Sequence, residues 1–119
     1  MQIELKPIGK ALYEQIADSI RAAIYDGTLH DGDKLPSIRE LTEELDVSDI
    51  TVKRAYSMLK NDRLVCTISG KGTFVHLDEH WRESRERELL NRIAEIADEL
   101  RKLGTAKEKL INEVNKVYE

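Results

Sequence analysis

The sequence predicts a mostly α-helical fold that includes one small β-hairpin. Two short segments with helix-capping residues are followed directly by two strand-like segments around a glycine-containing turn. Beyond residue 75, apolar residues recur at helical spacing along a long charged stretch. We therefore expect two parts, a compact domain over residues 1–75 and a helical tail over residues 76–119.

The first helix is expected to begin near Ala11 and to end at Asp26-Gly27, where glycine favours a helix stop. Its apolar stripe, which predicts a scaffold role, consists of Leu12, Ile16, Ile20, Ala23 and Ile24. Residues 1–10 are expected to form an arm, because Pro7 and Gly9 disfavour a helix. Residues 30–34 are expected to form a polar turn.

Two capped helices follow in quick succession. Ser37 and Glu40 have the spacing of a capping box, in which each side chain bonds to the backbone N–H of the other residue. This second helix ends near Asp46, and Ser48 is a good N-cap for a third helix over residues 49–61.

The third helix has two contrasting faces. One face is apolar and carries Val52, Ala55, Tyr56 and Leu59, whereas the opposite face carries Ile50, Lys53, Arg54 and Ser57. Ser48 and Thr51 add hydroxyls to the first turn. Cations suit guanine or phosphate, hydroxyls suit phosphates or bases, and a branched alkyl group suits a thymine methyl. The pattern favours a DNA major groove, with a plain solvent-exposed face as the alternative.

The expected hairpin comes directly after this helix. Residues 64–68 and 73–75 are rich in branched and aromatic residues, and Ser69-Gly70-Lys71-Gly72 between them is typical of a turn. Lys71 at the tip can reach a phosphate or the minor groove. The order of elements predicts a winged helix-turn-helix, with the hairpin as its wing.

Three blocks of the chain are Leu35-Pro36-Ser37-Ile38-Arg39-Glu40-Leu41, Val47-Ser48 with Thr51-Val52-Lys53-Arg54-Ala55-Tyr56, and Gly70-Lys71-Gly72-Thr73-Phe74-Val75. In this order and spacing, the blocks resemble the GntR family of bacterial transcription regulators. The resemblance implies that Arg39 contacts a phosphate or a base edge. It also implies DNA contacts from the third helix and the wing. The full set of expected DNA-binding residues is Ser37, Arg39, Ser48, Asp49, Ile50, Thr51, Lys53, Arg54, Ser57, Ser69, Gly70 and Lys71.

The chain departs from the family pattern in and after the third helix and in the wing, where Cys66 and Thr67 replace residues that are often basic. Asp49 stands where many members have arginine or another residue that suits DNA, and an acid favours a helix N-terminus but repels phosphate. Asp49 could accept from a cytosine amine, or it could simply cap the helix. Arg63 replaces a common glycine, so a left-handed backbone there would be mildly strained.

The composition argues against several other classes of protein. A chain of 119 residues with 40% hydrophobic content is too small to enclose a large substrate cavity, and it shows no catalytic constellation, so we expect no enzyme. His76 and His80 alone make a poor metal site, and the single Cys66 cannot form an internal disulfide. We expect no metal and no cofactor.

The charge balance is unusual for a DNA-binding protein. Lys and Arg number 19 against 23 Asp and Glu, giving a net charge of −4 where a basic footprint is typical. We therefore expect Glu43, Glu44 and Asp46 to point away from the cations. The absence of a long apolar run and of a basic-then-apolar leader predicts no membrane span, no secretion signal and a cytoplasmic protein.

The tail is expected to be a helical hairpin that forms a homodimer. Gly104 can end a long helix, and Thr105 with Glu108 resembles a capping box for a second helix. The expected dimerisation residues are Leu89, Leu90, Ile93, Ile96, Ala97, Leu100, Leu103, Leu110, Val114 and Val117. Two-fold pairing would match a palindromic operator in double-stranded DNA, whereas folding back on the chain's own first domain is the alternative.

The sequence as a whole predicts a homodimeric transcription regulator, more in keeping with a repressor than an activator. Its short two-helix tail resembles the YtrA subgroup, which implies control of a transporter-type operon. The alternatives are an antitoxin-like or architectural DNA binder without an effector, and a helical protein-interaction module that binds no DNA. A small-molecule effector stays an open question, because no residue marks its site.

Overall fold

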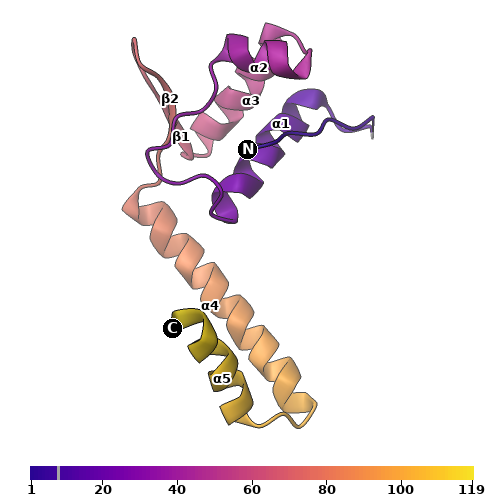
Figure 1. Cartoon of the computed structure of the whole chain (residues 1–119), viewed down its shortest axis with the longest axis vertical. Helices are drawn as coiled ribbons and strands as arrows, with labels where there is room; N and C mark the ends of the chain where they lie inside the picture. The colour runs from indigo at the N-terminus through magenta and orange to yellow at the C-terminus, as the bar shows by residue number, and fades with distance from the viewer. Residues whose placement is uncertain (8) are drawn as a thin grey trace. The chain divides into compact units, whose positions relative to one another are not determined.

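The computed structural model describes residues 1–7 and 9–119 and divides the chain into two compact units. Unit 1 is Met1–Leu77, and unit 2 is Asp78–Glu119 (Figure 1). The predicted arm over residues 1–10 has no helix in its described residues, whereas Ile8 lies outside them. No helix within the described ranges is long and apolar enough to cross a membrane.

In its described residues, unit 1 contains three helices and a two-stranded antiparallel sheet, as the sequence predicts. Their bounds are α1 Leu12–Tyr25, α2 Ile38–Leu45, α3 Asp49–Asn61, β1 Val65–Ile68 and β2 Gly72–Val75. The strands pair from Val65 opposite Val75 to Ile68 opposite Gly72, so β1 begins one residue later than expected and β2 one residue earlier. The mostly helical fold with a small wing is therefore confirmed.

The core of unit 1 lies between α1, α2, α3 and the base of the hairpin. Its largest fully buried side chains are Ile16, Ile20, Leu35, Leu41, Val52, Leu59, Leu64 and Val75. The predicted apolar face of α3 is buried at all four positions, and its Tyr56 hydroxyl donates to the Pro36 carbonyl oxygen over 2.6 Å. Burying each such aliphatic side chain contributes about 1.5–3 kcal/mol, which fixes α3 on the scaffold by one face.

Side-chain caps define where α2 and α3 begin. The Ser37 Oγ accepts from the Glu40 N–H over 3.0 Å, and the Glu40 Oε1 accepts from the Ser37 N–H over 3.1 Å, which confirms the capping box. The turn to α3 passes through Asp46, whose φ of 53° places it in the left-handed region. The Ser48 Oγ then accepts from the Thr51 N–H over 3.2 Å and caps α3 as predicted.

The link from α3 to the wing uses a left-handed residue at Arg63, where φ is 59°. Its neighbour Leu64 donates its N–H to the Leu59 carbonyl oxygen over 3.0 Å, which closes the end of the helix. The Arg63 backbone therefore has the mildly strained left-handed conformation that is expected of a non-glycine residue at this position.

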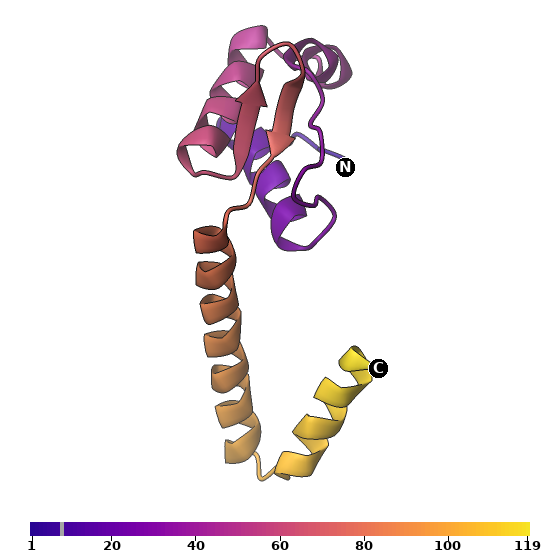
Figure 2. The same cartoon turned by 90° about the vertical axis from the view of Figure 1, so that its left-hand side faces the viewer.

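The segment that precedes α2 is more regular than the expected polar turn. The Leu35 N–H donates to the Thr73 carbonyl oxygen and the Val75 N–H to the Asp33 carbonyl oxygen, each over 2.8 Å. Lys34 forms a β-bridge opposite Phe74, so the end of this segment pairs with the outer edge of β2 (Figure 2). The polar-turn prediction is therefore wrong at Lys34, because long-range pairing decides its backbone.

Unit 2 contains two helices, α4 over Glu79–Lys102 and α5 over Lys107–Tyr118. Gly104, with φ of 84°, ends α4 as predicted, and the Thr105 N–H donates to the Leu100 carbonyl oxygen over 3.0 Å. This pattern is a Schellman motif, which occupies the Thr105 backbone. The predicted Thr105 capping box is therefore wrong, because α5 begins after Ala106 without a side-chain cap.

Candidate nucleic-acid interface

The recognition face of α3 is exposed where the sequence predicts it. Ile50 exposes 75% of its surface, and Lys53, Arg54 and Ser57 are exposed beside it. The opposite side of the same helix is buried against α1 and α2. A single exposed apolar residue is common on protein surfaces, so the feature that favours a binding surface is its position beside exposed cations and a hydroxyl on one helix face.

Two hydroxyls are held together at the start of α3. The Ser48 Oγ and Thr51 Oγ1 lie 2.8 Å apart, while the Ser48 Oγ also accepts from the Thr51 N–H. Within this pair only one hydroxyl needs to donate to the other, so the second keeps a hydrogen for an outside acceptor. The capping geometry thus positions one donor for a phosphate or base oxygen.

The two cations of the α3 face differ in their surroundings. Among the described residues, no carboxylate forms an ion pair with Lys53. The Arg54 guanidinium instead stacks on the Tyr13 ring of α1, with 3.9 Å between its central carbon and the ring centroid. Stacking orients the guanidinium and leaves its edge N–H groups able to donate. Arg54 therefore has a partner within the fold that the sequence analysis did not foresee.

Arg39 on α2 reaches solvent beside an acid. Its side chain is 89% exposed, and its Nε lies 3.3 Å from the Glu43 Oε1. The expectation that Glu43 points away from the cations is therefore wrong, because the two residues are four apart on one helix face. Exposed pairs of this kind contribute little to stability, so Arg39 can exchange Glu43 for a phosphate at small cost.

The capping box also sets the charge of Glu40. The Ser37 backbone N–H, helped by the Ser37 side chain and by the positive charge of Lys34, holds the pKa of the Glu40 carboxyl below its usual value. Its carboxylate is therefore ionised at neutral pH and engaged by the backbone of its own helix. The Ser37 hydroxyl accepts within the box and retains its hydrogen for an outside acceptor.

The wing tip is open on its outer side. Ser69, Gly70 and Lys71 are exposed, and the Lys71 N–H donates to the Ile68 carbonyl oxygen over 3.0 Å. Gly70 has a φ of 75° and no atom within 4 Å of the position where a Cβ would stand. A tight glycine turn of this kind lets a nucleic-acid backbone approach the wing closely.

The predicted site residues thus gather on α2, α3 and the wing of one unit. An acid is part of the same surface, because Asp49 is exposed in the first turn of α3. Two neighbours of this surface were missed by the sequence analysis, Tyr13 and Lys34. Neither has a local signal, since each meets the site only through packing of distant segments.

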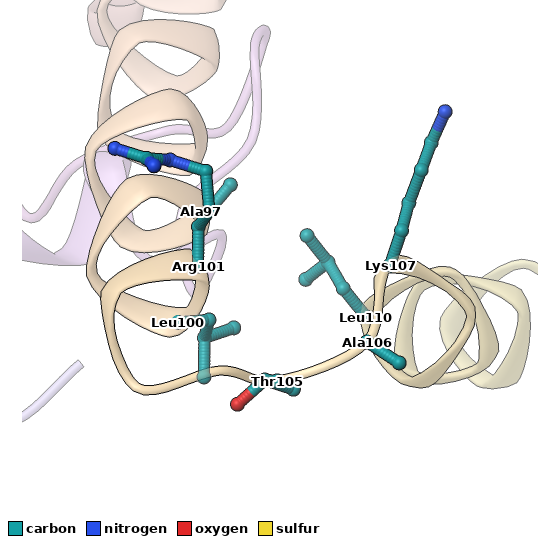
Figure 3. Close-up of a pocket in the computed structure, with 7 residues that line it drawn as sticks. All are labelled: Ala97, Leu100, Arg101, Thr105, Ala106, Lys107 and Leu110. Carbon is teal, nitrogen blue, oxygen red and sulfur yellow. The ribbon is translucent and has the colours of Figure 1, made fainter.

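Unit 2 exposes an apolar surface on both of its helices, neither of which contains a buried residue. Figure 2 shows α5 leaving the turn at an angle to α4, so the predicted hairpin is open. At the turn lies a cleft of about 320 Å³, into which Leu100 and Leu110 point from the two helices (Figure 3). The described part of the chain holds no group of three or more metal-ligating side chains.

Comparison with known proteins decides the family. The sequence model described as bacterial regulatory proteins, gntR family, matches residues 12–75, which is more than half of the chain. This chain belongs to the gntR family. GntR membership confirms a DNA-binding transcription regulator rather than an enzyme, and it fits the winged helix-turn-helix described above.

Three relatives show how far the likeness extends. The uncharacterized HTH-type transcriptional regulator YhcF of Bacillus subtilis is 32% identical over 106 residues, covering 86% of this chain and 85% of YhcF. The HTH-type transcriptional repressor YtrA of the same organism is 36% identical over 54% of this chain and 49% of YtrA. The Escherichia coli mannosyl-D-glycerate transport/metabolism system repressor MngR is 44% identical over 56% of this chain. The match spans only 28% of MngR.

Solved structures extend the likeness to most of the chain. A GntR family transcriptional regulator from Listeria monocytogenes has a TM-score of 0.62 and 36% identity over 93% of this chain and 98% of its own. YtrA from Sulfolobus acidocaldarius has a TM-score of 0.56 and 35% identity, and the match covers 78% of this chain and 96% of YtrA. AraR(DBD) in complex with operator ORX1 has a TM-score of 0.54 and 29% identity, and the match covers 63% of this chain and 90% of the AraR(DBD) chain. The YtrA relatives place this GntR regulator with the YtrA-type members.

Proposed function

We propose that this GntR regulator is a homodimeric repressor that binds a palindromic operator, with α3 in the major groove and the wing beside it. The observation that carries the proposal is the exposed face of α3 around Ile50 and Lys53, on a helix whose opposite face is buried. A helix held by one face can enter a groove with the other. AraR(DBD), which resembles unit 1, is itself solved with operator DNA.

The proposed roles of the residues follow from their chemistry and placement. Lys53 and Arg39 contact a guanine edge or a phosphate, and Ile50 contacts a thymine methyl. Asp49 accepts from a cytosine amine, a role that would distinguish this operator from those of relatives with arginine there. The remaining contacts to phosphates and sugars come from Ser37, Ser48, Thr51, Arg54, Ser57, Ser69, Gly70 and Lys71.

The proposed dimer forms through unit 2. Both tail helices present apolar side chains to solvent in the single chain, and Leu90, Ile93 and Ile96 each expose more than half of their surface. A second copy, related by two-fold symmetry, would cover this surface and the open cleft between α4 and α5 with a matching apolar surface. The proposed interface residues are Leu89, Leu90, Ile93, Ile96, Ala97, Leu100, Leu103, Leu110, Val114 and Val117.

The proposed target is a transporter-type operon, repressed in the cytoplasm. Support comes from the names of two relatives, the repressor YtrA and the transport/metabolism repressor MngR. Part of MngR lies beyond the matched segment, so the proposal carries over the mode of DNA binding and leaves the effector unassigned.

Selection of genomic DNA fragments by the purified protein tests this proposal. We expect one enriched sequence with two inverted half-sites about one helical turn apart, bound with an affinity that falls steeply with salt. Enrichment without an inverted repeat would contradict the two-fold dimer. Failure to retain duplex DNA even at low salt would favour the helical protein-interaction module instead.

A further inference from the structure

Lys34 occupies a defined position at the wing. Its backbone forms a β-bridge with Phe74, and the hydrogen bonds of Asp33 and Leu35 to β2 flank that bridge on both sides. The residue is therefore held by the sheet, although it lies outside the two named strands. A lysine anchored in this way has a fixed starting point for its side chain.

The side chain of Lys34 runs toward the turn of the wing. A Cβ built on Gly72 would lie 2.9 Å from the Lys34 Cε and 3.7 Å from its Nζ. The aliphatic stem therefore passes over Gly72, where a side chain in place of the glycine hydrogen would require the Lys34 stem to move. Because Gly72 follows Lys71 directly, the stem brings the Lys34 ammonium close to the turn that carries Lys71.

No carboxylate in the described residues forms an ion pair with Lys34 or Lys71. The acid that senses Lys34 is Glu40, whose carboxylate already accepts from the Ser37 N–H in the capping box. The Lys34 side chain is thus exposed and forms no ion pair among the described residues, although it interacts electrostatically with Glu40. Such a charge attracts a phosphate at little desolvation cost.

We propose that Lys34 is a further DNA-contacting residue, which binds a backbone phosphate beside the wing together with Lys71. The inference rests on the proposed DNA-binding surface and adds a residue from the segment before α2. The contact of its stem with Gly72 restricts the side chain before DNA arrives, which reduces the rotamer entropy lost on binding. A phosphate contact of this kind adds affinity without sequence preference.

The test compares Lys34→Met, which keeps the aliphatic stem and removes the charge, with Lys34→Arg, which keeps the charge. Lys60→Met serves as the matched control, because Lys60 is exposed in the last turn of α3, away from the capped start of that helix. Affinities for the selected operator and for an unrelated duplex are measured between 50 and 200 mM salt.

We expect Lys34→Met to lower the slope of log affinity against log salt by about 0.9 for each bound protomer. The ratio of wild-type to variant affinity should then shrink about 3.5-fold for each protomer between the two salt concentrations. The operator and the unrelated duplex should be affected equally. Lys34→Arg and Lys60→Met should keep the wild-type slope, and Lys71→Met combined with Lys34→Met should lose about twice as much slope as either alone.

Two results would overturn the inference. An unchanged salt slope in Lys34→Met, while Lys53→Ala weakens operator binding, would reject Lys34 as a phosphate contact and leave the α3 surface standing. If neither Lys34→Met nor Lys53→Ala changed DNA binding, both the proposed DNA-binding surface and the role of Lys34 would be rejected. Circular dichroism of each variant ensures that the comparison is made between folded proteins.

Discussion

The two units of this chain use their apolar residues in opposite ways. Unit 1 buries most of its apolar side chains in a core, with Ile16, Val52 and Leu59 fully removed from solvent, although Ile50 stays exposed. Unit 2 has comparable apolar spacing along α4 and α5 but buries none of it within the chain. Helical periodicity is therefore the same signal in both units, and only the tertiary structure shows that one apolar stripe is buried and the other is exposed.

The largest expected effect comes from removing unit 2. Truncation after Leu77 keeps the bonds from the His76 N–H to Leu64 and from the Leu77 N–H to Asp31, so unit 1 should still fold. Binding to a full palindrome should fall about 10²- to 10⁴-fold, toward the affinity for a half-site. Sedimentation and operator titration of the truncated and full chains measure this. A truncated chain that dimerises and binds normally would reassign the tail to another partner.

The second prediction breaks the tail surface without removing it. Leu90→Asp combined with Leu100→Asp places charges on the apolar stripe of α4, and a buried unpaired charge is very costly in an interface. We expect a shift from dimer to monomer by sedimentation, with the same loss of palindrome binding. Asn91→Asp adds a charge to the opposite side of α4 and should leave the dimer intact. A double variant that stays dimeric would exclude this stripe from the interface.

The third prediction separates the two cations of α3. Lys53→Ala should weaken operator binding by about 1–3 kcal/mol if the amine contacts a base, without changing the melting temperature. Arg54→Ala should also weaken binding, but it should cost about 0.5–1 kcal/mol of folding stability as well, because the stacking on Tyr13 is lost. In a Tyr13→Leu background the stability cost of Arg54→Ala should disappear. Thermal melts and operator titrations distinguish the two losses.

A fourth prediction compares the Ser37 cap of α2, which the structure shows, with the Thr105 cap of α5, which it does not show. Ser37→Ala removes a cap that the structure shows and should destabilise unit 1 by about 1 kcal/mol, or roughly 4–8 °C in a domain of this size. Thr105→Ala should leave the melting temperature of the chain unchanged, because Thr105 caps nothing at α5. A larger effect at Thr105 than at Ser37 would contradict both assignments.

The smallest expected effect concerns pH and Glu40. The pKa of its carboxyl is lower in the folded chain than the usual value of 4.5, so its contribution to stability is present above that pH and is lost as pH falls through the folded pKa. Glu40→Gln can still cap Ser37 but cannot ionise. The difference in melting temperature between wild type and Glu40→Gln should therefore narrow on acidification below pH 4.5. A difference that is constant with pH would show that the charge plays no part.

Short-range chemistry determined most of the local structure of this chain. The capping box at Ser37, the cap at Ser48 and the glycine stop at Gly104 each depend on residues within one or two turns, which a sequence displays directly. The buried face of α3 follows from its period for the same reason. The residues assigned to DNA contact remain predictions, because exposure alone does not identify a ligand.

Only the tertiary structure decided where distant segments meet. The stacking of Arg54 on Tyr13 joins α3 to α1, and the pairing of Lys34 with Phe74 joins the loop before α2 to the wing. The sequence also left two roles open for Thr105. Its side chain is suited to cap α5, but in the structure its backbone N–H donates to the Leu100 carbonyl oxygen at the end of α4. The sequence determined what each segment can form locally, whereas packing between segments far apart in the chain determined which of these local options the protein uses.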